Sequence, residues 1–292
     1  MSVELPDISI IIPVHNEEVA IGADLDTIRE AMDKSGRPYE VIVVDDGSTD
    51  GTAQAVRDRP WAQLVQHSEN RGTGAALMTG MRHACGQVIV MTDGDGTYPN
   101  QDMPHLIGYM EDYDMVVGAR KAEKGTWRWL RSPAKHFIRL LASYLTETNI
   151  PDLNSGLRAF KADIARRFFP LLPNGHSWVS TITIAFLSNG HPVKYVPIEY
   201  YVRKGRGSHF HPIRDTYNYI LLVIRAITYF NPLKVFLPLS LLLFAAGTIK
   251  LVRDIITFDW HVPGSTLMII LTAFQLLAIG LIADLIVRRS KA

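Results

Sequence analysis

The sequence predicts an α/β protein with a doubly wound, mostly parallel sheet, followed by two membrane-spanning helices. Short apolar runs rich in β-branched residues alternate with longer helical stretches up to residue 120, which is the pattern of βαβ units. These runs are apolar throughout, as expected for strands that helices cover on both faces. Two long apolar segments lie near the end of the chain and have the length needed to cross a bilayer.

Each expected element is bounded by polar residues, glycine or proline. The expected strands are residues 8–14, 39–44, 62–66, 87–92 and 115–117. The expected helices run from just after the first strand to about residue 34, and then over 50–58, 72–84 and 101–112. Because such a sheet binds ligands at the carboxyl ends of its strands, the residues that follow each strand are the first candidates for a site.

Three segments outside this pattern are candidates for contact with a membrane surface. Residues 121–133 are basic and aromatic without a clear period, and we interpret them as a mobile loop. Residues 134–149 place apolar side chains near helical spacing beside basic ones, which fits an interfacial helix or an ordinary surface helix. Residues 212–231 are too polar to span a membrane but suit its interface as a juxtamembrane helix.

The two apolar segments, about residues 233–251 and 266–287, are predicted to be transmembrane helices, with a buried helical hairpin as the alternative. The tail after them is basic, and positive residues mark the cytosolic side of a membrane. Two spans return the chain to the side on which it started. We therefore expect an integral membrane protein with a cytosolic domain (1–211), an interfacial helix (212–231) and a transmembrane unit (232–292).

Composition excludes several functional classes. The chain has 47% hydrophobic and 20% charged residues, which excludes a disordered or low-complexity protein. Its 30 basic and 29 acidic residues give a net charge of +1, which leaves no electrostatic footprint for nucleic acid. Because Cys85 is the single cysteine, a disulfide scaffold is impossible and a cysteine-based zinc site is not expected.

Three polar clusters carry the candidate chemistry. Residues 45–46 are aspartates after the second strand, where a carboxylate can accept from a base N–H or a ribose hydroxyl; a capped turn is the alternative. Asp93 and Asp95 flank a glycine after the fourth strand, and such a pair can hold Mg²⁺ together with substrate phosphates. The third cluster, residues 152–160, contains Arg158, whose fork suits a phosphate; a helix cap is the alternative.

Basic residues recur near strand ends and beside the segments expected at the membrane. Arg120 follows the fifth strand, Arg131 lies in the loop at 121–133, and Arg203 precedes the interfacial helix. Charges on a solvated face are the usual alternative, but this recurrence favours phosphate binding.

Five motifs in order resemble one family. They are residues 11–17 (IIPVHNE), 43–48 (VVDDGS), 70–74 (NRGTG), 93–99 (DGDGTYP) and 154–158 (NSGLR). With them the chain resembles the family 2 glycosyltransferases of the Rossmann-like GT-A fold. It is most similar to the polyprenyl-phosphate branch, which includes dolichyl-phosphate mannose synthases and undecaprenyl-phosphate glucosyltransferases. The resemblance covers essentially the whole chain, the two C-terminal spans included.

The resemblance implies a donor half and an acceptor half of one site. The positions that match the donor-nucleotide pocket are Pro13, His15, Glu17, Val44, Asp46, Asp93, Gly94 and Asp95. Asp95 matches the metal ligand, with Asp93 and Thr97 as further candidates, so the implied cofactor is Mg²⁺ or Mn²⁺. Arg203 falls near the donor diphosphate. The candidates for binding the lipid phosphate are Arg120, Arg131, Ser155, Arg158 and His209.

The implied reaction transfers a hexose from a nucleotide-sugar to a polyprenyl phosphate, undecaprenyl or dolichyl, with inversion. We expect catalysis to rest on Asp93, Asp95, Arg120 and Arg203, because a metal and Arg203 would stabilise the leaving diphosphate while Arg120 positions the acceptor. No general base is assigned, and Asp152 is the candidate. The two-span layout favours UDP-glucose, with GDP-mannose as the alternative. The site would face the cytosol at a bacterial or archaeal plasma membrane.

Two other interpretations have weaker support. A processive polysaccharide synthase would need more spans, and Gly125 stands where its Gln-x-x-Arg-Trp motif needs glutamine. A non-catalytic scaffold that binds nucleotide and bilayer need not retain all the carboxylates and arginines of the motifs. Gly247 and Gly280 lie within the two spans and are suited to packing against a neighbouring copy, so a homo-oligomer is a candidate assembly.

Overall fold

The computed structural model describes residues 6–121, 140, 143–144, 146–174, 177–203, 232–257 and 262–291. It divides into two compact units, residues 1–220 and 221–292. The described residues do not include Arg131, His209, the expected helix at 212–231, most of the expected helix at 134–149, or any of the expected loop beyond residue 121. The expectations about these parts of the chain stay predictions.

The first unit is built on a seven-stranded sheet with the strand order β3-β2-β1-β4-β6-β5-β7. Neighbouring strands are parallel, except that β6 runs antiparallel to both β4 and β5. The strands are β1 (Ile8–Val14), β2 (Tyr39–Asp45), β3 (Gln63–Gln66), β4 (Val88–Met91), β5 (Met115–Arg120), β6 (Arg158–Lys161) and β7 (Val193–Ile198).

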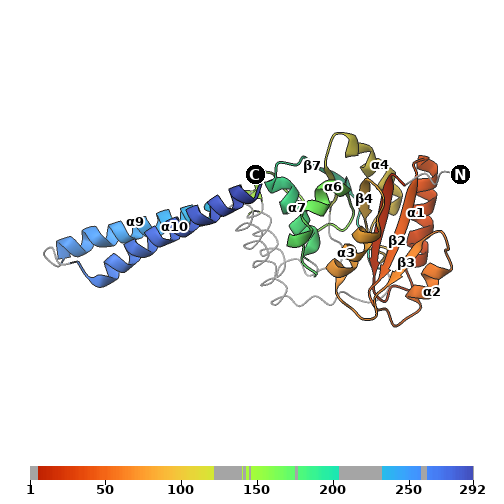
Figure 1. The fold of residues 1–292 in the computed structure, drawn as a ribbon, viewed down its shortest axis with the longest axis horizontal. Helices are drawn as coiled ribbons and strands as arrows, with labels where there is room; N and C mark the ends of the chain where they lie inside the picture. The colour runs from red at the N-terminus through yellow and green to blue at the C-terminus, as the bar shows by residue number, and fades with distance from the viewer. Residues whose placement is uncertain are drawn as a thin grey trace. The chain divides into compact units, whose positions relative to one another are not determined.

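Helices cover both faces of this sheet, as Figure 1 shows for α1 on one side and α3, α6 and α7 on the other. Ile10 and Ile12 of β1 belong to a core cluster shared with α1 and α4, whereas Ile11 points the other way and lies against Gly80 of α3. The helices are α1 (Ile21–Ser35), α2 (Thr52–Arg57), α3 (Thr73–His83), α4 (Met103–Gly108), α6 (Ala162–Arg167) and α7 (Trp178–Ser188). Among the described residues, short 3₁₀ helices also occur at η1 (Asn100–Asp102), η2 (Tyr109–Glu111) and η3 (Phe169–Leu171).

The predicted mostly parallel α/β fold is confirmed, and the five predicted strands are all present. The single helix expected over 101–112 is instead η1, α4 and η2 in succession. Pro104 lacks the N–H that a continuous α-helix would donate to the Asn100 carbonyl, so α4 begins afresh at Met103. The third polar cluster, expected between helices, leads directly into the antiparallel strand β6.

The second unit is a helical hairpin of α9 (Leu233–Thr257) and α10 (Gly264–Lys291). Both helices are long and apolar enough to cross a membrane, with mean hydropathies of 2.1 and 2.3. The helices approach closely where Gly247 lies against Ile270 and where Gly280 lies against Phe236. Large apolar side chains along both helices remain exposed, which favours a lipid rather than an aqueous surrounding.

α9 is longer than the predicted span because polar residues near its end are accommodated inside the hairpin. Lys250 Nζ donates to Asp254 Oδ2 at 2.6 Å and to Thr266 Oγ1 at 2.7 Å. The Ser240 hydroxyl donates to the Ala273 carbonyl at 2.9 Å. Since these groups satisfy one another, α9 continues through Asp254 to Thr257.

Candidate functional site

The carboxyl ends of β1 and β2 bring the first group of predicted donor residues together. Pro13 pairs with Val44 in the sheet, and the Asp46 amide donates to the Val14 carbonyl at 2.8 Å. His15 follows β1, and its Nδ1 lies 2.9 Å from the Asp46 carbonyl oxygen. Five of the expected donor residues therefore gather at this edge: Pro13, His15, Glu17, Val44 and Asp46. Gly94 joins them, since it lies against Val14 and Ile21.

The Asp46 carboxylate organises the loop that enters α3. Its Oδ1 accepts from the Arg71 amide at 2.9 Å and lies 2.7 Å from His67 Nδ1, while its Oδ2 accepts from the Gly72 amide at 2.8 Å. The Gly72 backbone has φ +94°, a conformation that would be strained in a residue with a side chain. Asp46 thus fixes the glycine-rich turn over the donor edge, a contact that the motif alone does not reveal.

Asp93 and Asp95 follow β4 and form the acidic centre of the edge. Burial, together with the neighbouring Asp95 charge, raises the pKa of Asp93 to about 7. Asp95 Oδ1 accepts from the Thr97 hydroxyl at 2.6 Å and from the Thr97 amide at 3.2 Å. Asp24 accepts from the Gly96 amide at 2.9 Å, so α1 also holds this turn. Thr97 orients the Asp95 carboxylate in this arrangement.

Arg203 comes from the far end of the sheet and meets two acidic residues. Its Nη2 donates to Glu17, and its Nε lies 3.5 Å from Asp95 Oδ2. Burial raises the pKa of Glu17, and the Arg203 guanidinium offsets part of that effect. An arginine here supplies positive charge beside the carboxylate pair, which suits a diphosphate.

Arg120, at the end of β5, is held by Asp152. Its Nε and Nη2 donate to the two carboxylate oxygens at 2.7 Å and 2.9 Å, and its amide donates to Oδ2 at 3.2 Å. The Asn154 amide donates to Oδ1 at 3.1 Å. Sequence reasoning offered Asp152 only as a candidate base; in the structure its carboxylate is occupied as the partner of Arg120.

Ser155 and Arg158 have different surroundings although they lie three residues apart. The Ser155 hydroxyl is buried and has no hydrogen-bond partner among the described residues, which leaves it as a candidate contact for a ligand oxygen. Arg158 is fully buried and donates to the Val179 carbonyl and the Thr183 hydroxyl, each at 2.7 Å, and to the Ser155 carbonyl. Burial lowers the pKa of Arg158 to about 10.

The expectation that Arg158 binds the lipid phosphate is therefore not retained. A phosphate could reach its guanidinium only by displacing carbonyl partners inside the core, which would leave buried acceptors unpaired. Arg158 instead joins the start of β6 to α7, and it supports Ser155 through the Ser155 carbonyl.

The acidic centre fits a divalent cation that shares its shell with phosphate oxygens. Among the described residues there is no group of three or more histidine, cysteine, aspartate or glutamate side chains that could hold a metal ion. Asp93 and Asp95 are nonetheless close enough for their charges to oppose each other, which favours a cation between or beside them. Mg²⁺ commonly binds through one or two carboxylates plus substrate phosphates.

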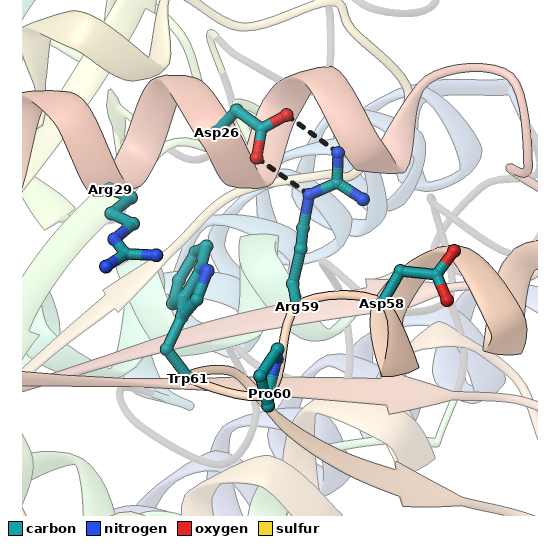
Figure 2. A pocket seen from close by; sticks show the side chains of 6 residues that line it. All are labelled: Asp26, Arg29, Asp58, Arg59, Pro60 and Trp61. Atoms are coloured by element: carbon teal, nitrogen blue, oxygen red, sulfur yellow. Dashed lines mark hydrogen bonds and ion pairs between the residues drawn. The ribbon is translucent and has the colours of Figure 1, made fainter.

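A hollow lined by α1 and by the segment between α2 and β3 contains none of the predicted site residues. Figure 2 shows Arg59 turned toward Asp26 and Arg29 lying over the Trp61 ring. The Arg59 hydrogen bonds to Asp26 are 2.7 Å and 2.8 Å long, and Arg29 Cζ is 5.3 Å from the ring centre. These arginines are engaged within the protein, so the hollow is a poor candidate for an anionic substrate.

Two family models match the chain. The model described as glycosyl transferase family 2 matches residues 9–169, and the model described as the GtrB C-terminal hairpin matches residues 231–288.

Curated proteins match part of the chain. An undecaprenyl-phosphate 4-deoxy-4-formamido-L-arabinose transferase from Aeromonas hydrophila is 31% identical over 185 residues, which are 57% of this chain and 55% of that protein. An uncharacterized glycosyltransferase of Bacillus subtilis, YkcC, is 34% identical over 152 residues, covering 49% of this chain and 46% of that protein. The chain thus spans about half the length of the curated relatives it matches.

Solved structures share the fold. Glucosyl-3-phosphoglycerate synthase from Mycobacterium tuberculosis in complex with uridine diphosphate aligns with a TM-score of 0.60 and 20% identity, over 76% of this chain and 80% of that one. The same enzyme with Mn²⁺, uridine diphosphate and phosphoglyceric acid also gives a TM-score of 0.60. At this identity the likeness concerns the fold alone.

Proposed function

Because the chain belongs to glycosyl transferase family 2, we propose that it transfers a hexose from a nucleotide-sugar, UDP-glucose, to a polyprenyl phosphate with inversion. The observation that carries the proposal is the presence of two arginine–carboxylate pairs at one edge of the sheet. Arg203 lies beside Asp95, and Arg120 lies against Asp152. The first pair suits the diphosphate that leaves, and the second suits the phosphate that attacks.

On the donor side, the chain must stabilise negative charge as the nucleoside diphosphate departs. Arg203 lies where its guanidinium can pair with a diphosphate that approaches the acidic centre, and such preorganised charge is a large contribution to catalysis. A divalent cation, Mg²⁺ or Mn²⁺, held by Asp93 and Asp95 would add Lewis-acid neutralisation of the leaving group. His15, Glu17 and the Pro13–Val44 edge would hold the nucleoside.

On the acceptor side, the nucleophile is a phosphate oxygen that is already anionic at neutral pH. It needs positioning more than a strong base, which agrees with the occupied carboxylate of Asp152. Arg120 would bind the phosphate, with the Ser155 hydroxyl as a second contact. Attack on the anomeric carbon forms the new C–O bond as the bond to the diphosphate breaks, so the configuration inverts.

The helical hairpin supports a lipid acceptor. Its length, its hydropathy and its exposed apolar side chains suit a membrane anchor, and the matching hairpin model covers the same residues. The product, a sugar joined to the lipid through one phosphate, would remain in the membrane with its head group on the cytosolic side of a bacterial or archaeal plasma membrane.

The test is transfer by the purified full-length protein in detergent with undecaprenyl phosphate and Mg²⁺ or Mn²⁺. The donors compared are UDP-glucose, UDP-galactose, UDP-N-acetylglucosamine, GDP-mannose and a nucleotide-linked 4-deoxy-4-formamido-L-arabinose. The last sugar is included because curated relatives are named for it. The proposal predicts label in the organic phase from UDP-glucose and its loss with EDTA. Transfer from one of the other donors and not from UDP-glucose would change the proposed donor sugar. Transfer from none of the donors would overturn the proposed reaction.

A further inference from the structure

We propose that Tyr200 is a positioning residue that fixes the Arg120 guanidinium on the acceptor side of the site. The inference rests on the proposed function, because it assigns the two sides to acceptor and donor. Tyr200 lies two residues after β7 and is half-buried against the core. It belongs to none of the motifs that the sequence brought forward.

The face of the Tyr200 ring supports Arg120. The Arg120 Cζ lies 5.2 Å from the centre of the ring, a distance typical of a cation–π contact. Asp152 binds the same guanidinium through two hydrogen bonds. Arg120 is thus held by a carboxylate along its Nε and Nη2 atoms and by an aromatic face, which restricts the orientations of its side chain.

The ring itself is held by a buried neighbour. Tyr98 meets Tyr200 edge to face, with ring centres 5.3 Å apart and planes at 70°. The Tyr98 hydroxyl accepts from the Gly156 amide at 2.7 Å, in the same turn as Ser155. A side chain at Gly156 would collide with Asp93, so this turn packs directly on the acidic centre.

The segment that carries Tyr200 also contacts the donor side of the site, through Thr97. The Tyr201 amide donates to the Thr97 carbonyl at 2.9 Å. The Thr97 hydroxyl in turn donates to Asp95 at 2.6 Å. A few residues further on, Arg203 lies beside Asp95. One short segment after β7 therefore contacts both halves of the site.

This arrangement has a consequence for binding. A guanidinium already fixed in position loses less conformational freedom when the phosphate arrives, which strengthens acceptor binding without adding a contact. The part of Tyr200 that serves Arg120 is the face of its ring, so a substitution that keeps an aromatic ring should keep this role.

The experiment compares Tyr200→Leu, Tyr200→Phe and wild type in the full-length protein, with KM measured separately for undecaprenyl phosphate and for the active donor. Tyr200→Leu removes the aromatic face and should raise the acceptor KM roughly 2- to 30-fold, the range of a cation–π contact. Tyr200→Phe keeps the face and should restore the acceptor KM. The donor KM should change little in either variant, because the contact of this segment with Thr97 is made by backbone atoms.

Tyr113→Leu is the matched control. Tyr113 also packs against the core with a cation, Lys194, 5.6 Å from its ring centre, but it lies beside η2 at the other end of β5. It should change neither KM. An unchanged acceptor KM in Tyr200→Leu would overturn the role in holding Arg120. A raised acceptor KM in Tyr200→Phe, which keeps the aromatic face, would also overturn it, even if Tyr200→Leu does not fold.

The two proposals fail in different ways. If wild type transfers no sugar, the proposed reaction is wrong, and Tyr200 is then tested by calorimetric binding of undecaprenyl phosphate alone. Weaker binding by Tyr200→Leu than by Tyr200→Phe still supports the positioning of Arg120. Equal binding by the two variants overturns it.

Discussion

The guanidinium of Arg120 donates two hydrogen bonds to the carboxylate of Asp152, at 2.7 Å and 2.9 Å. Both side chains are largely buried, with 13% and 11% of their surface exposed. Burial alone would raise the pKa of Asp152, but the hydrogen bonds and charge of Arg120 outweigh it and hold the pKa below its usual value. Asp152 is therefore an anionic partner of Arg120 at neutral pH and a poor proton acceptor.

Asp152→Asn should lower kcat/KM for the polyprenyl phosphate by about 10- to 100-fold, because a misplaced Arg120 no longer meets the acceptor in a reactive geometry. The donor KM should change little. Asp163→Asn is the control, since Asp163 forms an exposed pair with Arg167 on α6. If Asp152 were a general base, kcat alone would fall and the acidic limb of the pH–rate profile would disappear.

Arg158→Leu should destabilise the protein without a selective effect on acceptor binding. It removes buried hydrogen bonds to Val179, Thr183 and Ser155, and a loss of roughly 2 to 5 kcal/mol is expected. Thermal unfolding in detergent should show a midpoint lower by roughly 5 to 15 °C. An unchanged midpoint together with a higher acceptor KM would restore Arg158 as a phosphate ligand.

Arg203→Gln should weaken binding of uridine diphosphate with Mn²⁺ by about 10-fold or more, because a charge-assisted contact to the diphosphate is lost. Titration calorimetry on the full-length protein measures this directly. Lys121→Gln is the control on the neighbouring segment: Lys121 pairs with Glu199 in an exposed position and should contribute little. Equal affinities of Arg203→Gln and wild type would remove Arg203 from the donor site.

Asp114 makes part of the stability of the first unit dependent on pH. Burial would raise its pKa, but hydrogen bonds from Lys161 and His191 hold the pKa below its usual value. A carboxyl with a lowered pKa stabilises the fold above its unfolded pKa near 4, and this contribution is lost as pH falls through the folded value. Asp114→Asn should therefore unfold at a lower temperature than wild type at about pH 6. The difference between the two unfolding temperatures should narrow below about pH 4. A difference in unfolding temperature that stays constant with pH would contradict this assignment.

The parallel core of the fold could be predicted from sequence because its signals are local. The strands β1, β2, β4 and β5 each contain a short apolar run, and Asp93 and Asp95 closely follow β4. The strands β6 and β7 lack such a signal, since β6 begins with Arg158 and β7 contains Lys194 and Pro197.

The parts of the site that sequence reasoning missed depend on contacts between distant residues. Asp152 and Arg120 are 32 positions apart, and Tyr200 is further still from Arg120. The burial of Arg158 depends on hydrogen bonds to the Val179 carbonyl and the Thr183 hydroxyl of α7, and no local sequence pattern around Arg158 indicates these partners. A lone arginine after a polar turn fits a phosphate ligand and a core hydrogen-bond donor equally well.

The most direct test of the central claim is the mass of the lipid product formed from UDP-glucose and undecaprenyl phosphate by the full-length protein. Hexose transfer predicts one species, heavier than the acceptor by a single hexose residue and containing one phosphorus atom, with uridine diphosphate released in equal amount. A product with two phosphorus atoms would show transfer of a sugar phosphate. That result, or the absence of any lipid product, would contradict the account.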